Sequence, residues 1–96
     1  MMSGLLIRGG TIVNEGESYR GWIVVEGERI ARTGRGDYPR PEFDGETIDA
    51  EGMYVLPGVI DDQVHFREPG YPQKGSIASE SRAAVAGGIT SFMDMP

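Results

Sequence analysis

Polar and apolar side chains alternate along a short stretch, residues 57–70, that lies between a Pro-Gly turn and a Glu-Pro-Gly turn. In a β-strand, residues two apart share a face. One face of this strand would consist of Asp61, Gln63, His65 and Arg67, and the other of Ile60, Val64 and Phe66, interrupted by Asp62. A parallel strand that is covered on both sides is expected to be apolar on both. The alternation therefore predicts either a solvated sheet face or a site made of polar groups.

His65 is the only histidine of the chain and lies at the carboxyl end of this predicted strand. Burying a neutral polar group without a partner costs about 1–3 kcal/mol, so a row of such groups is retained only where it is solvated or used. In parallel α/β folds, sites are built at the carboxyl ends of strands. Periodicity alone leaves two interpretations open, an amphipathic edge strand with a surface histidine and a functional site.

A helix and a second strand are predicted after this stretch. Ser76 is a suitable N-cap, Glu80 lies near the positive end of the helix dipole, and Gly87-Gly88 ends the helix. Residues 89–95 then form an apolar strand. A strand, a helix and a strand predict one β-α-β unit, with the loops after residues 66 and 95 on the same rim. The apolar stripe expected to face the sheet contains Ile77, Ala84 and Val85.

The first 56 residues are expected to be all-β, because they show short strand-like runs and no helical period. Gly9-Gly10 predicts a bend or bulge between two short strands, and Gly27 predicts a hairpin turn with positive φ. The last two runs are expected to pair with each other around a turn at residues 50–52. The runs are residues 5–13, 22–25, 29–33, 47–49 and 53–56.

Composition excludes some classes of function. The net charge of -6 argues against binding to a phosphate backbone, so no nucleic-acid partner is expected. No apolar run approaches the roughly 20 residues of a membrane span, and the amino terminus lacks the apolar core of a signal peptide. We therefore expect a soluble cytoplasmic protein with no membrane partner. Because the chain has no cysteine, it offers no disulfide and no thiolate chemistry.

Two strings of the sequence, PGVIDDQVHFREPG (57–70) and SRAAVAGGITSFMDMP (81–96), closely resemble dihydroorotases of the amidohydrolase superfamily, which are cyclic amidohydrolases. The resemblance covers essentially the whole chain. It implies an α/β protein in which residues 1–57 are part of a small β-sandwich domain. Residues 58–96 would be the first β-α-β unit of an incomplete (β/α)8 TIM-type barrel of a metal-dependent hydrolase. Since such a barrel needs roughly 250 residues, the 96-residue chain is expected to be an amino-terminal fragment, inactive alone.

The resemblance also implies roles for the polar row, which consists of Asp61, Gln63, His65 and Arg67. The family's first metal motif is Asp-x-His-x-His-x-Arg, and Gln63 stands here at the first histidine position. The full-length enzyme would contain one or two Zn²⁺ ions. His65 would bind one of them, and Asp61 would orient the ligands. Gln63 could bind metal weakly through its amide oxygen, support His65 without binding, or leave that half of the site loose. No catalytic residue is expected within the chain.

The implied activity is that of a zinc-dependent dihydroorotase, which reversibly interconverts N-carbamoyl-L-aspartate and dihydroorotate in pyrimidine biosynthesis. Arg67 would bind the carboxylate of this small-molecule substrate. It could instead form an exposed ion pair with Glu68 or Asp61. Two other functions stay open, an allantoinase- or hydantoinase-like cyclic amidohydrolase and a non-catalytic homologue that acts as an assembly partner. The full-length protein is expected to be a homo-oligomer.

Overall fold

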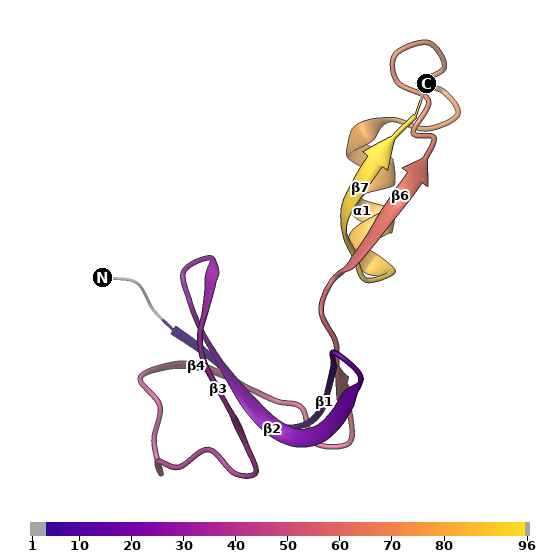
Figure 1. Ribbon diagram of the computed structural model, residues 1–96. Coiled ribbons are helices and arrows are strands. Elements are labelled where there is room, and N and C mark those ends of the chain that lie inside the picture. Colours follow the sequence, from indigo (N-terminus) through magenta and orange to yellow (C-terminus); the bar gives the residue numbers. More distant parts are fainter. Residues whose placement is uncertain (1–3, 96) are drawn as a thin grey trace. The chain divides into compact units, whose positions relative to one another are not determined.

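The computed structural model describes residues 4–95 and divides the chain into two compact units with the boundary between Pro57 and Gly58. The predicted domains, residues 1–57 and 58–96, include residues 1–3 and 96, which lie outside the described range. The first unit contains β1 (Gly4–Asn14), β2 (Glu17–Glu26), β3 (Arg29–Arg35), β4 (Gly45–Asp49) and β5 (Tyr54–Val55) (Figure 1). The second contains β6 (Val59–Val64), α1 (Ile77–Ala86) and β7 (Ile89–Asp94). The first unit is all-β, as the sequence predicts.

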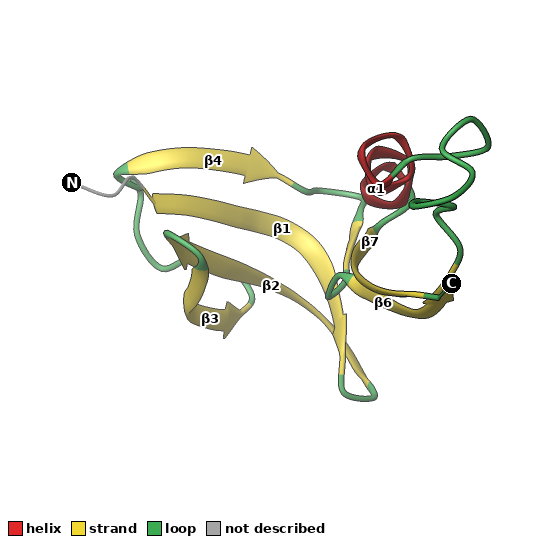
Figure 2. Cartoon of the chain, turned by 90° about the horizontal axis from the view of Figure 1, so that it is seen from above, coloured by secondary structure: helices red, strands yellow, loops and turns green. Residues whose placement is uncertain are grey.

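A single five-stranded sheet forms the first unit. Its strand order is β3-β2-β1-β4 (Figure 2). The short β5 also pairs with β1. The expected pairing between residues 47–49 and 53–56 is wrong, because β4 and β5 each pair with β1 in parallel, at successive positions along it. Two hydrogen bonds hold the segment between β4 and β5 against β1. Ala50 N–H donates to Arg8 O at 2.8 Å, and Thr11 N–H donates to Met53 O at 2.9 Å. The 11-residue β1 is long enough to serve both short strands.

The predicted bulge lies in β1. The register of the β1–β2 ladder shifts between Arg8 and Gly10, and Gly9 has a φ of 79°. Glycine adopts this backbone conformation without steric cost, which is why the bulge occurs here. The bulge is thus confirmed, although it interrupts one continuous strand and does not separate two short ones. The hairpin between β2 and β3 is also confirmed, with Gly27 at a φ of 61°.

The core of the first unit lies on one face of the sheet. Leu6, Trp22 and Val24 are buried there, and Tyr38 and Phe43 from the loop between β3 and β4 pack against them. The Trp22 and Tyr38 rings meet edge to face at 5.1 Å, and Tyr38 and Phe43 do so at 6.0 Å. Such aromatic pairs stabilise by about 0.5–1.5 kcal/mol beyond the area they bury. The loop therefore covers this face, while the β-sandwich of which the sheet would be part stays a prediction.

The second unit is a β-α-β element. Strands β6 and β7 are parallel, and α1 packs against β7 on one face of the pair (Figures 1 and 2). The predicted N-cap is confirmed: Ser76 Oγ accepts from Ser79 N–H, and Ser79 Oγ accepts from Ser76 N–H, each at 3.1 Å. Gly87 caps the other end, as predicted. These reciprocal bonds satisfy backbone groups that every helix end leaves open.

Apolar burial in the second unit is sparse. Phe66, 6% exposed, packs on Phe92 with ring centroids 4.5 Å apart. The expected apolar stripe of the helix is only partly covered, because Ala84 is half-buried whereas Ile77 and Val85 are exposed. A sheet of two strands is too narrow to cover a whole helix face.

We expect the isolated 96-residue chain to self-associate and to show no cooperative melting of residues 58–95. This unit buries little apolar surface, and Ile60 and Met93 are more than half exposed on its strands. Exposed apolar strands with unpaired edges are sites of aggregation. Calorimetry together with sedimentation velocity tests this expectation. A monomer in which both units melt cooperatively would contradict it.

Candidate functional site

The carboxyl ends of β6 and β7 lie at the same end of the second unit, because the strands are parallel (Figure 1). Strand β6 ends at Val64, so His65 and Arg67 follow the strand. The predicted alternation is therefore wrong beyond Val64. Arg67 has a φ of 69°, in the left-handed region that non-glycine residues rarely adopt, and its carbonyl accepts from Tyr71 N–H at 2.9 Å. This turn carries the chain out of the extended conformation.

The other three residues of the polar row lie on or directly after β6. Asp61 is half-buried, and its Oδ1 accepts from Gln63 N–H at 3.1 Å. Gln63 and His65 are exposed. The Asp61 carboxylate thus fixes the backbone at Gln63, which is compatible with the supporting role predicted for it. The metal-binding roles of His65 and Gln63 stay predictions.

Asp94, at the end of β7, ties the two strand ends together. Its Oδ1 accepts from Phe66 N–H at 3.2 Å, and Met95 N–H donates to Val64 O at 2.8 Å. The segment that carries His65 is therefore held at the carboxyl edge of the sheet. Asp94 is not among the site residues predicted from the sequence. A signal was present, since Asp94 is a charged residue that ends an apolar parallel strand, where sites are built.

Arg67 lines an open hollow of about 440 Å³. Neither carboxylate considered as its partner pairs with it: Glu68 Oε2 accepts from Ile77 N–H at 2.6 Å, and Asp61 is bonded to Gln63. Every ion pair among residues 4–95 belongs to the first unit. The guanidinium of Arg67 is thus available to an external anion as far as the described residues are concerned. The hollow is lined by Arg67, Glu68, Pro69, Tyr71, Asp94 and Met95.

The residues present fit part of a zinc site. Zinc in proteins is held by imidazole, thiolate or carboxylate ligands, usually three or four of them. Within residues 4–95 no group of three or more His, Cys, Asp or Glu side chains is placed to hold a metal. His65 offers an exposed imidazole, and Gln63 offers an amide oxygen, which is a poorer donor for zinc. Any further ligands would have to come from outside the described residues.

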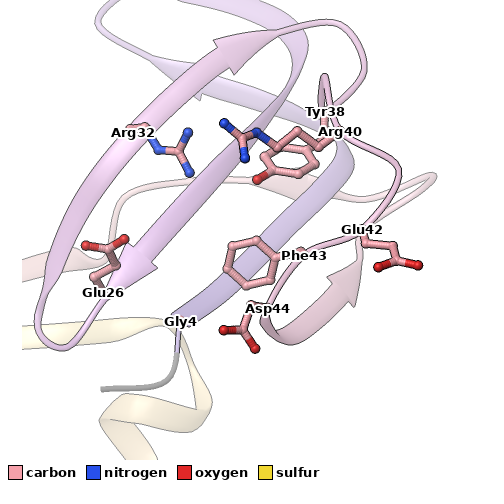
Figure 3. Close-up of a pocket in the computed structure, with 8 residues that line it drawn as sticks. All are labelled: Gly4, Glu26, Arg32, Tyr38, Arg40, Glu42, Phe43 and Asp44. Atoms are coloured by element: carbon pink, nitrogen blue, oxygen red, sulfur yellow. The ribbon is translucent and has the colours of Figure 1, made fainter. Parts of the chain in front are cut away.

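A second, larger hollow of about 660 Å³ lies in the first unit (Figure 3). Arg32 and Arg40 line it beside Tyr38. Three carboxylates line it as well. They are Glu26, Glu42 and Asp44. The hollow contains no histidine, and we assign no function to it.

Arg20 and Asp37 form a surface ion pair in the first unit, and each shifts the pKa of the other. Hydrogen bonding from Arg20, followed by the attraction of its charge, lowers the pKa of the Asp37 carboxyl and raises the pKa of the guanidinium. Both groups are exposed, and exposed pairs contribute little to stability. The pair is a structural feature and not a second site.

Comparisons with known proteins agree on one group of enzymes. The chain is 42% identical over 97 residues to an allantoinase of Solibacter usitatus and 44% identical over 94 residues to a dihydroorotase of Trichlorobacter lovleyi. These matches cover 99% and 96% of the chain. The structure of an L-hydantoinase (dihydropyrimidinase) from Arthrobacter aurescens matches all of the chain, with a TM-score of 0.85 and 29% identity. No protein-family model matches the sequence.

Over almost its whole length, this chain is homologous to a portion of each of these longer proteins, which are cyclic amidohydrolases. It spans about a fifth of their length, 20% of the allantoinase, 22% of the dihydroorotase and 21% of the hydantoinase. Relatives named dihydroorotase and allantoinase match it at similar identity, so the names identify the group and not the substrate. Among residues 4–95, no helix combines the length and the apolar character that crossing a membrane requires.

Proposed function

We propose that the protein containing this chain is a dihydroorotase, which hydrolyses dihydroorotate to N-carbamoyl-L-aspartate and catalyses the reverse cyclisation. The observation that carries the proposal is the placement of Arg67. It lies at the carboxyl edge of a parallel sheet, lines a hollow, and has no carboxylate partner among residues 4–95. Dihydroorotate carries a carboxylate, and a guanidinium binds a carboxylate with two parallel hydrogen bonds.

The other residues of the row would prepare the same edge for a metal. His65 would hold a zinc ion, Gln63 would bind it weakly or not at all, and Asp61 would keep the backbone at Gln63 in place through the hydrogen bond to its N–H. Zinc, when bound, would supply the Lewis-acid activation of water that amide hydrolysis needs at neutral pH. The general acid and the remaining metal ligands would come from parts of the protein outside this chain.

The proposal is tested by the substrate preference of the purified intact protein. We expect kcat/KM to be highest for dihydroorotate among dihydroorotate, allantoin and hydantoin, and we expect the reverse cyclisation of carbamoyl aspartate to be measurable. Loss of both directions after treatment with a chelator, and recovery with zinc, would support the metal assignment. A clear preference for allantoin or hydantoin would overturn the choice of substrate.

Two specific observations favour the alternatives. An allantoinase is among the relatives, at 42% identity, which favours another cyclic amidohydrolase. Gln63, in place of a histidine, favours a non-catalytic homologue that acts in an assembly. The same assay separates the three, because the second enzyme would prefer allantoin and the homologue would turn over none of the substrates. The cytoplasmic location and the homo-oligomeric state stay predictions.

A further inference from the structure

We propose that Glu68 is a positioning residue for Arg67. Its side chain anchors the loop that follows Arg67 to the first residue of α1 and thereby fixes the direction of the arginine. This inference rests on the proposed function, in which Arg67 binds the substrate carboxylate. The loop after β6 begins at His65 and leads through Arg67 and Glu68 to the N-cap of α1 at Ser76. The side chain of Glu68 reaches across this loop to the start of the helix.

The anchor is a hydrogen bond between a carboxylate and a helix terminus. Glu68 Oε2 accepts from Ile77 N–H at 2.6 Å. Ile77 is the first residue of α1, and the N–H groups of the first turn have no partner within the helix. Ser76 Oγ already accepts from Ser79 N–H, so the carboxylate of Glu68 satisfies a different donor of the same turn. The negative charge also lies at the positive end of the helix dipole, which strengthens the bond.

The backbone of Arg67 is held on both sides. On the amino-terminal side, Phe66 N–H donates to Asp94 Oδ1 at 3.2 Å. On the carboxyl-terminal side, the Arg67 carbonyl accepts from Tyr71 N–H at 2.9 Å, and the next residue is Glu68 with its bond to the helix. These three bonds maintain the left-handed conformation of Arg67, which an arginine rarely adopts without such support.

This arrangement explains how a residue that does not touch the substrate can affect its binding. No described carboxylate holds the guanidinium of Arg67, so its direction depends on its backbone. Loss of the anchor would let the loop move, and the arginine would then lose conformational freedom when it binds the carboxylate. A small misplacement of a binding group costs up to about 100-fold in rate or affinity. Glu68 therefore acts through Arg67.

The test uses Glu68→Ala in the intact protein, alone and combined with Arg67→Met. For Glu68→Ala we expect KM for dihydroorotate to rise about 10-fold, with kcat changed less than about twofold, because binding and not chemistry is disturbed. Glu68→Gln keeps an acceptor for the Ile77 N–H and should recover most of the wild-type KM. Amide hydrogen exchange at Ile77 should be faster in Glu68→Ala. Glu80→Gln, which removes a charge from the same helix turn, is the matched control and should leave KM unchanged.

The double variant decides the mechanism. If Glu68 acts through Arg67, adding Glu68→Ala to Arg67→Met changes KM by less than about twofold, because residues that act as a unit are not additive. An undiminished 10-fold effect in that background, or an unchanged KM in Glu68→Ala alone, overturns the positioning role. If Arg67→Met itself leaves KM unchanged, the carboxylate assignment of the proposed function fails, and the positioning role fails with it. Should Glu68→Ala not fold, Glu68→Met takes its place, because it keeps the length of the side chain but removes the carboxylate that accepts from Ile77 N–H. A wild-type KM in folded Glu68→Met then overturns the proposal.

Discussion

Replacing Arg67 with methionine is expected to lower kcat/KM for dihydroorotate by about 30-fold to several thousandfold in the intact protein. Truncating one partner of a charge pair that becomes buried on binding costs about 2–5 kcal/mol, and this range gives the expected loss. Methionine keeps the length of the apolar stem but has no charge and no hydrogen-bond donor. The zinc content should stay near that of the wild type, because Arg67 is not an expected ligand. Steady-state kinetics and metal analysis of the same preparations test both statements.

The matched control for this experiment is Arg82→Met. Arg82 is an exposed arginine in α1, so the substitution removes the same charge from the same unit without touching the hollow. We expect its kcat/KM to stay within about twofold of the wild type, as is usual for surface substitutions. If Arg67→Met behaves like Arg82→Met, Arg67 does not bind the carboxylate. Allantoin and hydantoin should then be examined as substrates.

The second large effect concerns zinc. In the intact protein, Gln63→His is expected to retain more zinc per chain after dialysis than the wild type, and His65→Ala is expected to lose the zinc held at this edge. Imidazole is a much better zinc ligand than a neutral amide oxygen, which accounts for the gain. His65 is the only imidazole of the chain, which accounts for the loss. Activity need not follow the zinc content, because groups around the metal are adjusted to the natural ligand.

Plasma emission spectrometry of the dialysed proteins measures the zinc content per chain and tests both expectations. Gln73→His is a suitable control, since it adds the same imidazole at an exposed position in the loop before α1. It should bind no more zinc than the wild type. Two zinc ions per chain in the dialysed wild type would falsify the idea of a weak site at Gln63. No zinc in any variant would instead favour the non-catalytic homologue.

The sequence alone determined the features that depend on a few neighbouring residues. The bulge at Gly9, the hairpin at Gly27 and the caps of α1 at Ser76 and Gly87 were all predicted from it. Each of them follows from a local preference: glycine adopts positive φ without cost, and a serine hydroxyl can satisfy the open N–H groups of a helix end. The polar row of residues 61–67 was also visible in the sequence, because side chains in a strand alternate between faces.

Only the tertiary structure decided which distant groups meet. Strands β4 and β5 pair with β1 and not with each other, because a long strand offers more hydrogen bonds than a short hairpin does. The end of β6 at Val64 and the turn at Arg67 depend on two hydrogen bonds, one donated by Phe66 N–H to Asp94 and one donated by Tyr71 N–H to the Arg67 carbonyl. The bond from Ile77 N–H to Glu68 spans nine positions, and no local pattern encodes it. Hydrogen bonds across such distances depend on how the whole chain packs, so the sequence named the residues of the candidate site but not the contacts that orient them.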